Sequence, residues 1–235
     1  FLQGRGIERY STHIVTTEYL LFPKKSIGDS HMTDLHLSVS RGNAKMGAIP
    51  SISLPPIKTC SPDACKFCGK MCYAKKIARL RKSVNDAYER NLTILENEPE
   101  KFWREANAAV AVSRFFRFGV SGDIYNADYL EHMVEIAKNN KHCEILCFTK
   151  QFDICNAYLE HHKFPKNLHI LFSAWKGMEM KNPHNLPEAH VFYKDGTTTA
   201  KDGAKFCSNN CFACAIAGSN CWSLKNGEQI MFKQH

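Results

Sequence analysis

The fold is decided by residues 115–150, which read "FFRFGVSGDIYNADYLEHMVEIAKNNKHCEILCFTK". Residues 115–120 are an apolar run with the character of a strand, and Ser-Gly-Asp at 121–123 is the exit from that strand. The following segment repeats apolar side chains at helical spacing behind Asn126, a residue type that caps helices. A second apolar strand closes the stretch at residues 143–150. A strand, a helix and a strand in this order predict a parallel β-α-β unit.

The same alternation extends to both sides of this unit. Before it we expect a strand that ends at two prolines and then two helices, over residues 51–56, 83–98 and from Pro99 onward. After it we expect one helix and three strands, over residues 152–162, 168–175, 189–194 and 228–235. The strands are nearly continuous apolar runs, which indicates a sheet covered on both faces. About five or six strands are too few for a complete eight-stranded barrel, so we expect an α/β fold in the form of a partial or distorted (β/α) TIM-like barrel, with a doubly wound sheet as the alternative.

The first thirty residues differ in character from the rest of the chain. Ser30, His31 and Met32 resemble the junction that common expression vectors leave, and no stable hydrophobic period precedes them. We interpret residues 1–31 as an expression tag or fusion remnant, with a native N-terminal extension as the alternative. Residues 32–235 show no internal repeat and no low-complexity linker, which predicts a single domain.

Composition and charge limit the class of protein. The chain has 235 residues and a formal net charge of +8, and no apolar run approaches the length that a membrane span needs. We find no secretory signal and therefore expect a cytoplasmic protein without a membrane partner. The basic balance permits contact with nucleic acid or with an anionic small molecule. The densest basic stretch is "KKIARLRK" at residues 75–82, which suits such a contact or a solvated helix face.

Two groups of four cysteines carry the strongest chemical signal. The groups are Cys60-x4-Cys65-x2-Cys68-x3-Cys72 and Cys207-x3-Cys211-x2-Cys214-x6-Cys221. Eleven cysteines in a chain without a secretory signal argue against a disulfide framework and favour metal binding. Four soft thiolates suit either zinc or an iron–sulfur cluster, and zinc ribbons use two CxxC pairs, which neither group contains. We therefore predict one or two clusters, of the [4Fe-4S] type, with zinc as the alternative.

The other three cysteines have a different setting. Cys143, Cys147 and Cys155 lie at packing positions of an expected strand and an expected helix. A free cysteine in such a position behaves as a small apolar residue. We therefore predict that these three side chains belong to the hydrophobic core.

Polar residues follow the expected strands where each strand ends. Because the carboxyl ends of parallel strands meet at one edge of a barrel, we expect these residues to share one face with the first cysteine loop. We assign Arg117, Asp123 and Lys150 as candidate catalytic residues. Ser121, Gly122 and Ser173 are the candidate cofactor-binding residues. Thr149 is a further polar residue at the end of an expected strand. Asp123 is the strongest single candidate, because it follows a Ser-Gly turn that lets backbone approach a ligand.

Several segments together resemble a known family. They are "LHLSVSRGNAKMG" from Leu35, "IPSISLPPIKTC" from Ile49, "CYAKK" from Cys72, "RFGVSGDIYNADYL" from Arg117, "FTK", "SAW" and the closing "FKQH". They look like the phage gene-product-88 family, and the likeness runs from about Leu35 to His235. The resemblance implies a phage or prophage protein of unassigned reaction that is made in the host cytoplasm.

The motif layout is also similar to radical S-adenosylmethionine (SAM) partial barrels. Cys207, Cys211 and Cys214 have the CxxxCxxC spacing of that superfamily, and Gly122-Asp123 stands where its members hold the amino end of the cofactor. The likeness departs in two ways, because the triplet lies near the C-terminus and each group has a fourth thiol. A fourth thiolate closes a cluster that would otherwise leave one iron open for SAM or a substrate.

We therefore expect an iron–sulfur protein of phage type. It has either an open iron or an adjacent pocket for a small ligand, and redox or radical chemistry if it is an enzyme. The alternative is a zinc-stapled structural or nucleic-acid-interacting module without catalysis.

Overall fold

The computed structural model describes residues 35–234 of the chain. The expected boundary between an appended segment and the native chain, at residues 31 and 32, lies outside the described residues. Residues 35–234 belong to one compact unit.

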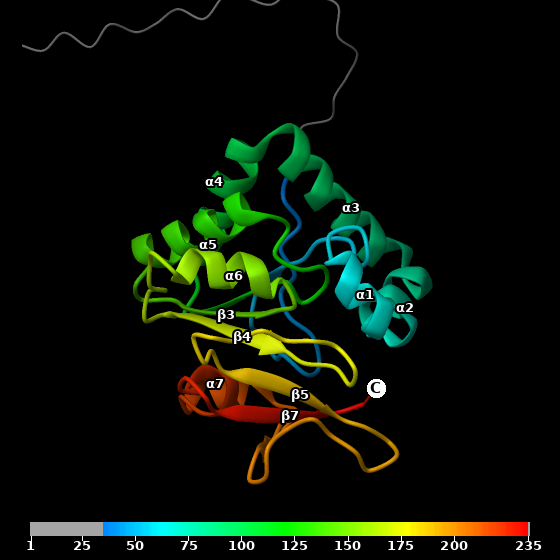
Figure 1. Ribbon diagram of the computed structural model, residues 1–235. Helices are drawn as coiled ribbons and strands as arrows, with labels where there is room; N and C mark the ends of the chain where they lie inside the picture. The colour runs from blue at the N-terminus through cyan, green and yellow to red at the C-terminus, as the bar shows by residue number, and fades with distance from the viewer. Residues whose placement is uncertain (1–34, 235) are drawn as a thin grey trace, which may run out of the picture. The chain divides into compact units, whose positions relative to one another are not determined.

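A single sheet of seven strands forms the centre of this unit, and every neighbouring pair of strands is parallel. The strand order is β1-β2-β3-β4-β5-β7-β6, of which Figure 1 labels β3, β4, β5 and β7. The strands are β1 (Ser51–Ile52), β2 (Phe115–Phe118), β3 (Glu144–Thr149), β4 (Leu168–Ser173), β5 (Glu188–Phe192), β6 (Lys205–Phe206) and β7 (Gln229–Lys233). The expected α/β class with a parallel sheet is thereby confirmed. From β1 to β5 the strands lie in chain order, whereas a doubly wound sheet reverses its order, so the structure does not support that alternative.

Helices fill most of the connections between strands. They are α1 (Pro62–Cys68), η1 (Gly69–Met71), α2 (Tyr73–Leu80), α3 (Lys82–Asn97), α4 (Pro99–Ala111), α5 (Ala127–Asn139), α6 (Phe152–Leu159), α7 (Cys211–Ile216) and η2 (Asn220–Trp222). Asn126 caps α5 as expected, because its side-chain oxygen accepts a hydrogen bond from the Tyr129 N–H at 2.8 Å. Pro99 occupies the start of α4, where its missing N–H leaves no intrahelical bond unmade.

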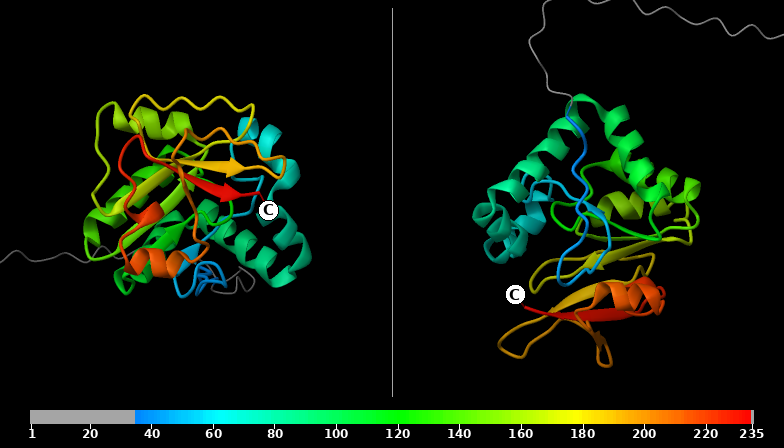
Figure 2. Two further views of the ribbon diagram at one scale, coloured as in Figure 1. Left: turned by 90° about the horizontal axis from the view of Figure 1, so that it is seen from below. Right: turned by 180° about the vertical axis from the view of Figure 1, so that it is seen from behind.

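Alternation along each strand separates two hydrophobic clusters. Phe116 and Phe118 of β2 lie in one cluster with side chains of α3, α4, α5 and α6. Phe115 lies in the other cluster, with Trp222 of η2 and side chains of α7. Since successive strand residues point to opposite faces, α3 to α6 cover one face of the sheet and α7 with η2 covers the other. Figure 2 shows α6 and α7 on opposite sides of the strands. We call the face that carries α7 the inner face.

Three cysteines belong to the helix-covered cluster. Cys143, Cys147 and Cys155 are fully or almost fully buried there. Cys147 is paired across the sheet with Phe118 on one side and with Ile170 on the other. Their assignment to the core is therefore confirmed.

A buried asparagine attaches the N-terminal segment to α3. The Asn91 Nδ2 group donates to the carbonyl oxygens of Ser38 and Ser53, each at 3.0 Å. Its Oδ1 atom accepts from the Ser38 N–H at 2.7 Å. Asn91 is only 1% exposed, so these bonds fix the residues on both sides of β1 against α3.

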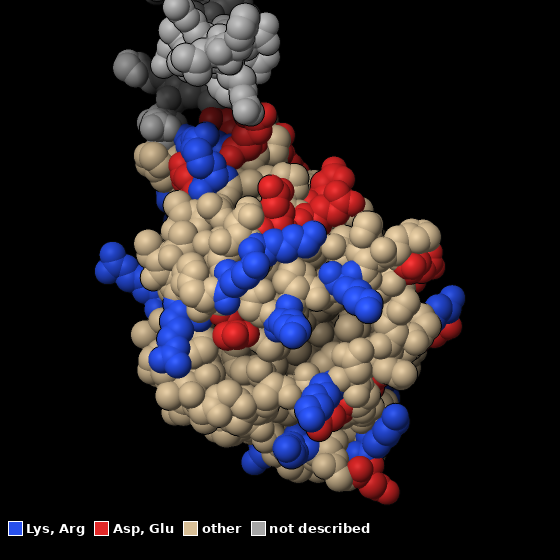
Figure 3. Space-filling view, turned by 90° about the vertical axis from the view of Figure 1, so that its left-hand side faces the viewer, with Lys and Arg blue, Asp and Glu red and all other residues tan. Residues whose placement is uncertain are grey.

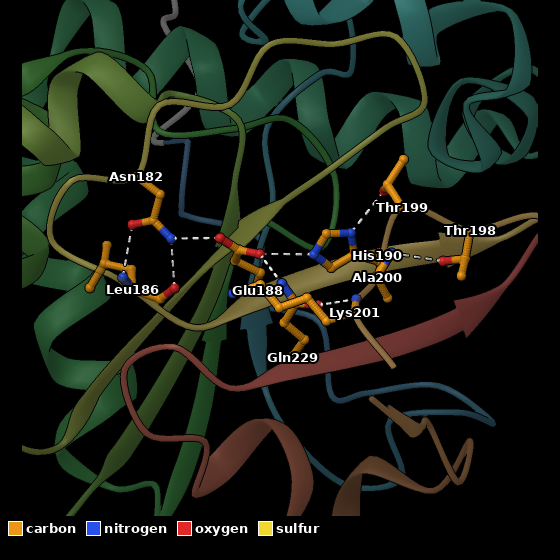
Figure 4. A network of polar contacts seen from close by, with 9 residues as sticks. All are labelled: Asn182, Leu186, Glu188, His190, Thr198, Thr199, Ala200, Lys201 and Gln229. Carbon is orange, nitrogen blue, oxygen red and sulfur yellow. Dashed lines mark hydrogen bonds and ion pairs between the residues drawn. The ribbon is translucent and has the colours of Figure 1, made fainter. Parts of the chain in front are cut away.

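A second polar network links β5 to β7 and to the loop after β5 (Figure 4). His190 is buried, with Nδ1 2.8 Å from Thr199 Oγ1 and Nε2 2.9 Å from Glu188 Oε2. Glu188 also accepts hydrogen bonds from Asn182 Nδ2 at 2.9 Å and from Gln229 Nε2 at 2.5 Å. Burial raises the pKa of Glu188, but its hydrogen bonds from Asn182, His190 and Gln229 outweigh burial and hold the pKa below its ordinary value. Both ring nitrogens of His190 are engaged, so the network holds this part of the sheet together.

Charged side chains of both signs occur on one face of the molecule (Figure 3). Figure 3 shows the left-hand side of the view in Figure 1, where basic and acidic side chains are interspersed. The basic stretch at residues 75–82 lies on α2 and the start of α3. No helix within residues 35–234 has the length and apolar character needed to cross a membrane.

Candidate functional site

A cavity of about 450 Å³ lies against the inner face of the sheet. Its wall includes seven of the eight cysteines of the two groups, namely Cys60, Cys68, Cys72, Cys207, Cys211, Cys214 and Cys221. The six polar or turn residues assigned from the strand ends also line it, namely Arg117, Ser121, Gly122, Asp123, Lys150 and Ser173. The parallel sheet brings these strand ends to one edge, and the loops that follow β1 and β6 add the cysteines.

The first cysteine group is built from short helical turns after β1. Ser61 caps α1 through a weak bond from the Ala64 N–H, and Cys72 caps α2 through a bond from the Lys75 N–H, each at 3.5 Å. Cys65 does not line the cavity, but the Cys65 N–H donates to the Ser61 carbonyl at 3.0 Å within the turn that begins α1. The turns therefore gather all four thiols within a single loop.

Burial opposes ionisation of the thiols of Cys60, Cys65 and Cys68. Burial raises the pKa of Cys60 to about 12. Burial also raises the pKa of Cys65 and of Cys68, and the positive charge of Lys150 works in the opposite direction at both. Lys150 is therefore the positive charge that favours the thiolate forms of Cys65 and Cys68.

The second cysteine group crosses the inner face. The Cys207 N–H donates to the Met231 carbonyl at 2.8 Å, which ties the start of the group to β7. Asn210 caps α7 by accepting from the Ala213 N–H at 3.0 Å. The Cys214 sulfur accepts a hydrogen bond from Asn220 Nδ2 at 3.1 Å, which connects α7 to η2. The four thiols are thus held by α7, η2 and the last strand.

A different pair of cations acts on the second group. Burial raises the pKa of Cys221 to about 12, and the Arg117 charge works against this rise. Burial also raises the pKa of Cys211, where Arg117 and Lys45 both work to lower it. Each cysteine group therefore has its own positively charged neighbour, although the two groups share one cavity.

Asp123 is buried, and both of its carboxylate oxygens are engaged. Oδ1 accepts from the Thr149 hydroxyl at 2.6 Å and from the Ile124 N–H at 2.8 Å, and Oδ2 accepts from the Lys150 N–H at 2.9 Å. Burial raises the pKa of Asp123 above its ordinary value, while Lys150 and these hydrogen bonds work to lower it. The carboxylate joins the exit of β2 to the end of β3 and so fixes the position of Lys150. This arrangement is that of a positioning residue.

Gly122 brings the loop after β2 against the loop after β1. Its φ is +75°, a region that side-chain-bearing residues rarely adopt. A Cβ atom at this position would lie 2.5 Å from Thr59 Oγ1 and 2.9 Å from Leu54 Cβ. Ser121 reinforces the same contact, because its N–H donates to Ser53 Oγ at 3.3 Å and its carbonyl accepts from the Leu54 N–H at 3.0 Å. Glycine is therefore required here by the close approach of two loops.

Arg117 points from β2 into the cavity. Its guanidinium carbon lies 5.0 Å from the centre of the Phe148 ring, a cation–π distance. Its Nε atom is buried and has no hydrogen-bond partner within residues 35–234. A buried N–H without a partner is destabilising, so the Nε–H group of Arg117 is available to donate a hydrogen bond to a molecule in the cavity. Ser173, at the end of β4, is paired with Ala189 of β5 at the same wall.

Some residues of the cavity carry no recognisable sequence signal. Lys45 precedes β1 and lies over the ring of Phe232 at 4.9 Å. Tyr73, directly after Cys72, donates a hydrogen bond to the Val120 carbonyl and so links α2 to the exit of β2. Lys45 and Phe232 come from opposite ends of the chain, and no local pattern pairs them. Tyr73 could have been found only through its position beside a cysteine.

Residues 232–234 of the closing "FKQH" segment also line the cavity, whereas His235 lies outside the described residues. Gln234 lines the cavity, and its Nε2 atom lies 3.0 Å from the sulfur of Met71, a residue of the first cysteine loop. The Gln234 N–H donates to the Phe192 carbonyl at 2.9 Å. The end of β7 is therefore fixed between the first cysteine loop and β5.

All eleven cysteines are free thiols. Within residues 35–234, no three Cys, His, Asp or Glu side chains converge in the way that the ligands of a single metal ion do. The site thus consists of two sets of thiols around one cavity, with Lys150 acting on the first set and Arg117 with Lys45 acting on the second.

Comparison with known proteins places the chain among phage proteins. The family model described as "Gene product 88" matches residues 33–208. The Gene 88 proteins of Mycobacterium phages L5 and D29 are each 27% identical over 202 and 203 residues, which cover 77% of this chain and 80% of each relative. No solved structure matches. The chain therefore belongs to the gene product 88 family.

Proposed function

We propose that this protein binds an iron–sulfur cluster of the [4Fe-4S] type through the two cysteine groups that face the cavity. The observation that carries the proposal is that seven cysteines from two segments of the chain line one cavity. Isolated buried cysteines are common in protein cores, but seven around one hollow are not explained by packing. The amount of iron per chain distinguishes one bound cluster from two.

The donor set fits such a group. Thiolate sulfur is the ligand type that iron–sulfur clusters use, and a cluster binds each thiolate to a separate iron. The thiols of one group therefore need to surround a volume, which the arrangement around a cavity supports. Deprotonation of these buried thiols is opposed by burial, and a bound metal removes that penalty because metal-coordinated thiols are deprotonated.

The protein's own residues would serve the cluster in two ways. Lys150 beside the first group, and Arg117 with Lys45 beside the second, supply positive charge that offsets the charge of bound thiolates. Asp123 holds Lys150 in place through the Lys150 N–H, and Gly122 permits the close packing of the loops around the first group. When bound, the cluster supplies one-electron redox chemistry.

The finer expectations on architecture belong to the same proposal. Strands β1 to β5 follow chain order, and helices α3 to α6 lie on the face opposite the cavity. Both features support an open, partial (β/α) barrel. The fourth cysteine of the second group, Cys221, lines the cavity with the CxxxCxxC triplet. We therefore do not extend the proposal to SAM chemistry.

The setting of the protein is proposed from its family. The phage relatives support production in a host cytoplasm, which is a reducing compartment where free thiols and clusters persist. Nucleic-acid binding through the basic stretch on α2 and α3 stays a prediction.

The test is purification of the full chain without oxygen, followed by measurement of iron, acid-labile sulfide and zinc. We expect brown protein with broad absorbance near ~400 nm and comparable amounts of iron and sulfide. Replacement of Cys72 or Cys211 by serine lowers the iron content. The matched control is Cys155→Ala, which alters a core cysteine outside the cavity and leaves the iron content unchanged. Colourless protein with stoichiometric zinc refutes the proposal and establishes the zinc-stapled alternative.

A further inference from the structure

We infer that the cavity also binds a small organic anion, a carboxylate or phosphate on a flat apolar body, and that Arg117 holds its anionic group. The inference extends the proposed function, because the anion would bind in the same cavity as the cluster. It does not require the cluster, because the residues that carry it are an arginine, lysines and aromatic side chains.

The first observation is the state of Arg117. Its Nε atom is buried without a hydrogen-bond partner in the described part of the chain. The guanidinium carbon is 5.0 Å from the centre of the Phe148 ring, a cation–π distance, and Arg117 lines the cavity. A guanidinium presents its donors as a planar fork that matches a carboxylate or phosphate. The unpaired Nε is one prong of that fork.

The second observation is the charge of the wall. Lys45, Lys150 and Lys233 line the cavity together with Arg117. Asp123 is the one acidic residue among the described residues of the wall, and it already accepts three hydrogen bonds. Cations that outnumber the acidic groups in a partly enclosed hollow concentrate anions there.

The third observation is the aromatic surface beside the cations. Phe148 and Phe232 meet edge to face with their centres 5.7 Å apart, and Lys45 lies over Phe232 as Arg117 lies over Phe148. Trp175 and Trp222 also line the cavity. A ligand with an anionic end and a flat apolar body satisfies both kinds of wall. The volume of about 450 Å³ falls in the range of small-molecule sites.

The experiment measures affinity by calorimetry on the full chain, purified without oxygen, with three probes of similar shape. Benzoate carries a carboxylate, phenyl phosphate carries a phosphate, and benzamide is the neutral counterpart of benzoate. We expect at least one anionic probe to bind about tenfold or more tightly than benzamide, because a bond to a charged group is worth that much. The stronger of the two anions identifies which class the site takes.

Variants assign the effect to Arg117. Arg117→Gln weakens the anionic probe about tenfold or more and leaves benzamide unchanged, and Arg117→Lys, which keeps the charge without the fork, lies between. Arg79→Gln is the matched control, because it makes the same substitution on the exposed surface of α2 and leaves the affinity of all probes unchanged. If Arg117→Gln does not fold, Arg117→Lys alone decides.

Three outcomes overturn the inference: neither anion binds, benzamide binds as well as benzoate, or the Arg117 variants keep full affinity for the anion. Iron and sulfide are measured on the same samples. Anion binding by protein that carries no iron refutes the cluster proposal alone. A brown protein that binds no anionic probe refutes this inference alone.

Discussion

Replacing Asp123 with asparagine tests whether this carboxylate holds the end of β3 in place. The amide oxygen of asparagine can still accept from the Thr149 hydroxyl and the Ile124 N–H, which Oδ1 accepts from at 2.6 and 2.8 Å. The amide nitrogen takes the position of Oδ2, which accepts from the Lys150 N–H at 2.9 Å, and two donors then face each other. The variant loses the hydrogen bond from the Lys150 N–H to the carboxylate, and that N–H is left unpaired. In return, the buried negative charge of Asp123 is removed, which relieves its desolvation penalty. We expect a net loss of about 1–3 kcal/mol in the free energy of unfolding.

Urea unfolding followed by circular dichroism measures this loss, with all proteins at the same metal content. The midpoint should fall while the slope stays constant, which marks a change in stability alone. Asp202→Asn, an exposed control, should stay within about 0.5 kcal/mol of the parent. Thr149→Val provides a double-mutant cycle, and the two sites should be coupled by about 0.5 kcal/mol or more. Full stability of the Asp123→Asn variant, or strict additivity with Thr149→Val, refutes the assignment of Asp123 as a positioning residue.

Three further substitutions test features of the fold. Asn91→Ala removes the three hydrogen bonds that Asn91 makes with Ser38 and Ser53, so thermal denaturation should show a loss of about 2–4 kcal/mol in the free energy of unfolding. A loss below about 1 kcal/mol contradicts the view that Asn91 holds these residues against α3. Gly122→Ala should cost more than Gly196→Ala in the same assay, because both positions have positive φ but only the first Cβ meets a neighbour; equal costs would show that the loops do not need this close approach. The stability contributed by ionised Glu188, whose folded pKa is depressed, is complete above its unfolded pKa near 4.5 and is lost as pH falls through the folded value. Unfolding free energies measured against pH should therefore fall less steeply in acid for Glu188→Gln than for the parent, and parallel curves would contradict this linkage.

Local pattern was sufficient to predict the centre of the fold. The β-α-β unit, the cap at Asn126 and the start of α4 at Pro99 each depend on residues that are close in sequence. The gathering of Arg117 and Lys150 at one wall followed from a single rule, that the ends of parallel strands meet at one edge. These features need no knowledge of which distant segments pair.

Long-range pairing explains what could not be predicted. The short strand β6 was not expected, and β7 pairs between β5 and β6, so the second cysteine group lies across the inner face. The contact of Lys45 with Phe232 depends on that same pairing, and its two residues have no shared pattern. The engagement of Asp123 by three donors was also invisible in the sequence, because any acidic residue after a strand can be either a ligand or a structural group.

The contact between Gln234 and Met71 joins residues that are 163 positions apart. During synthesis the first cysteine loop leaves the ribosome long before β7, which ties Cys207 to the sheet and places Phe232 and Gln234 in the cavity wall. The nascent chain therefore carries exposed thiols through most of its translation and can enclose them only when the last strand is available. The wall of the cavity is thus complete only after β7 has been synthesised.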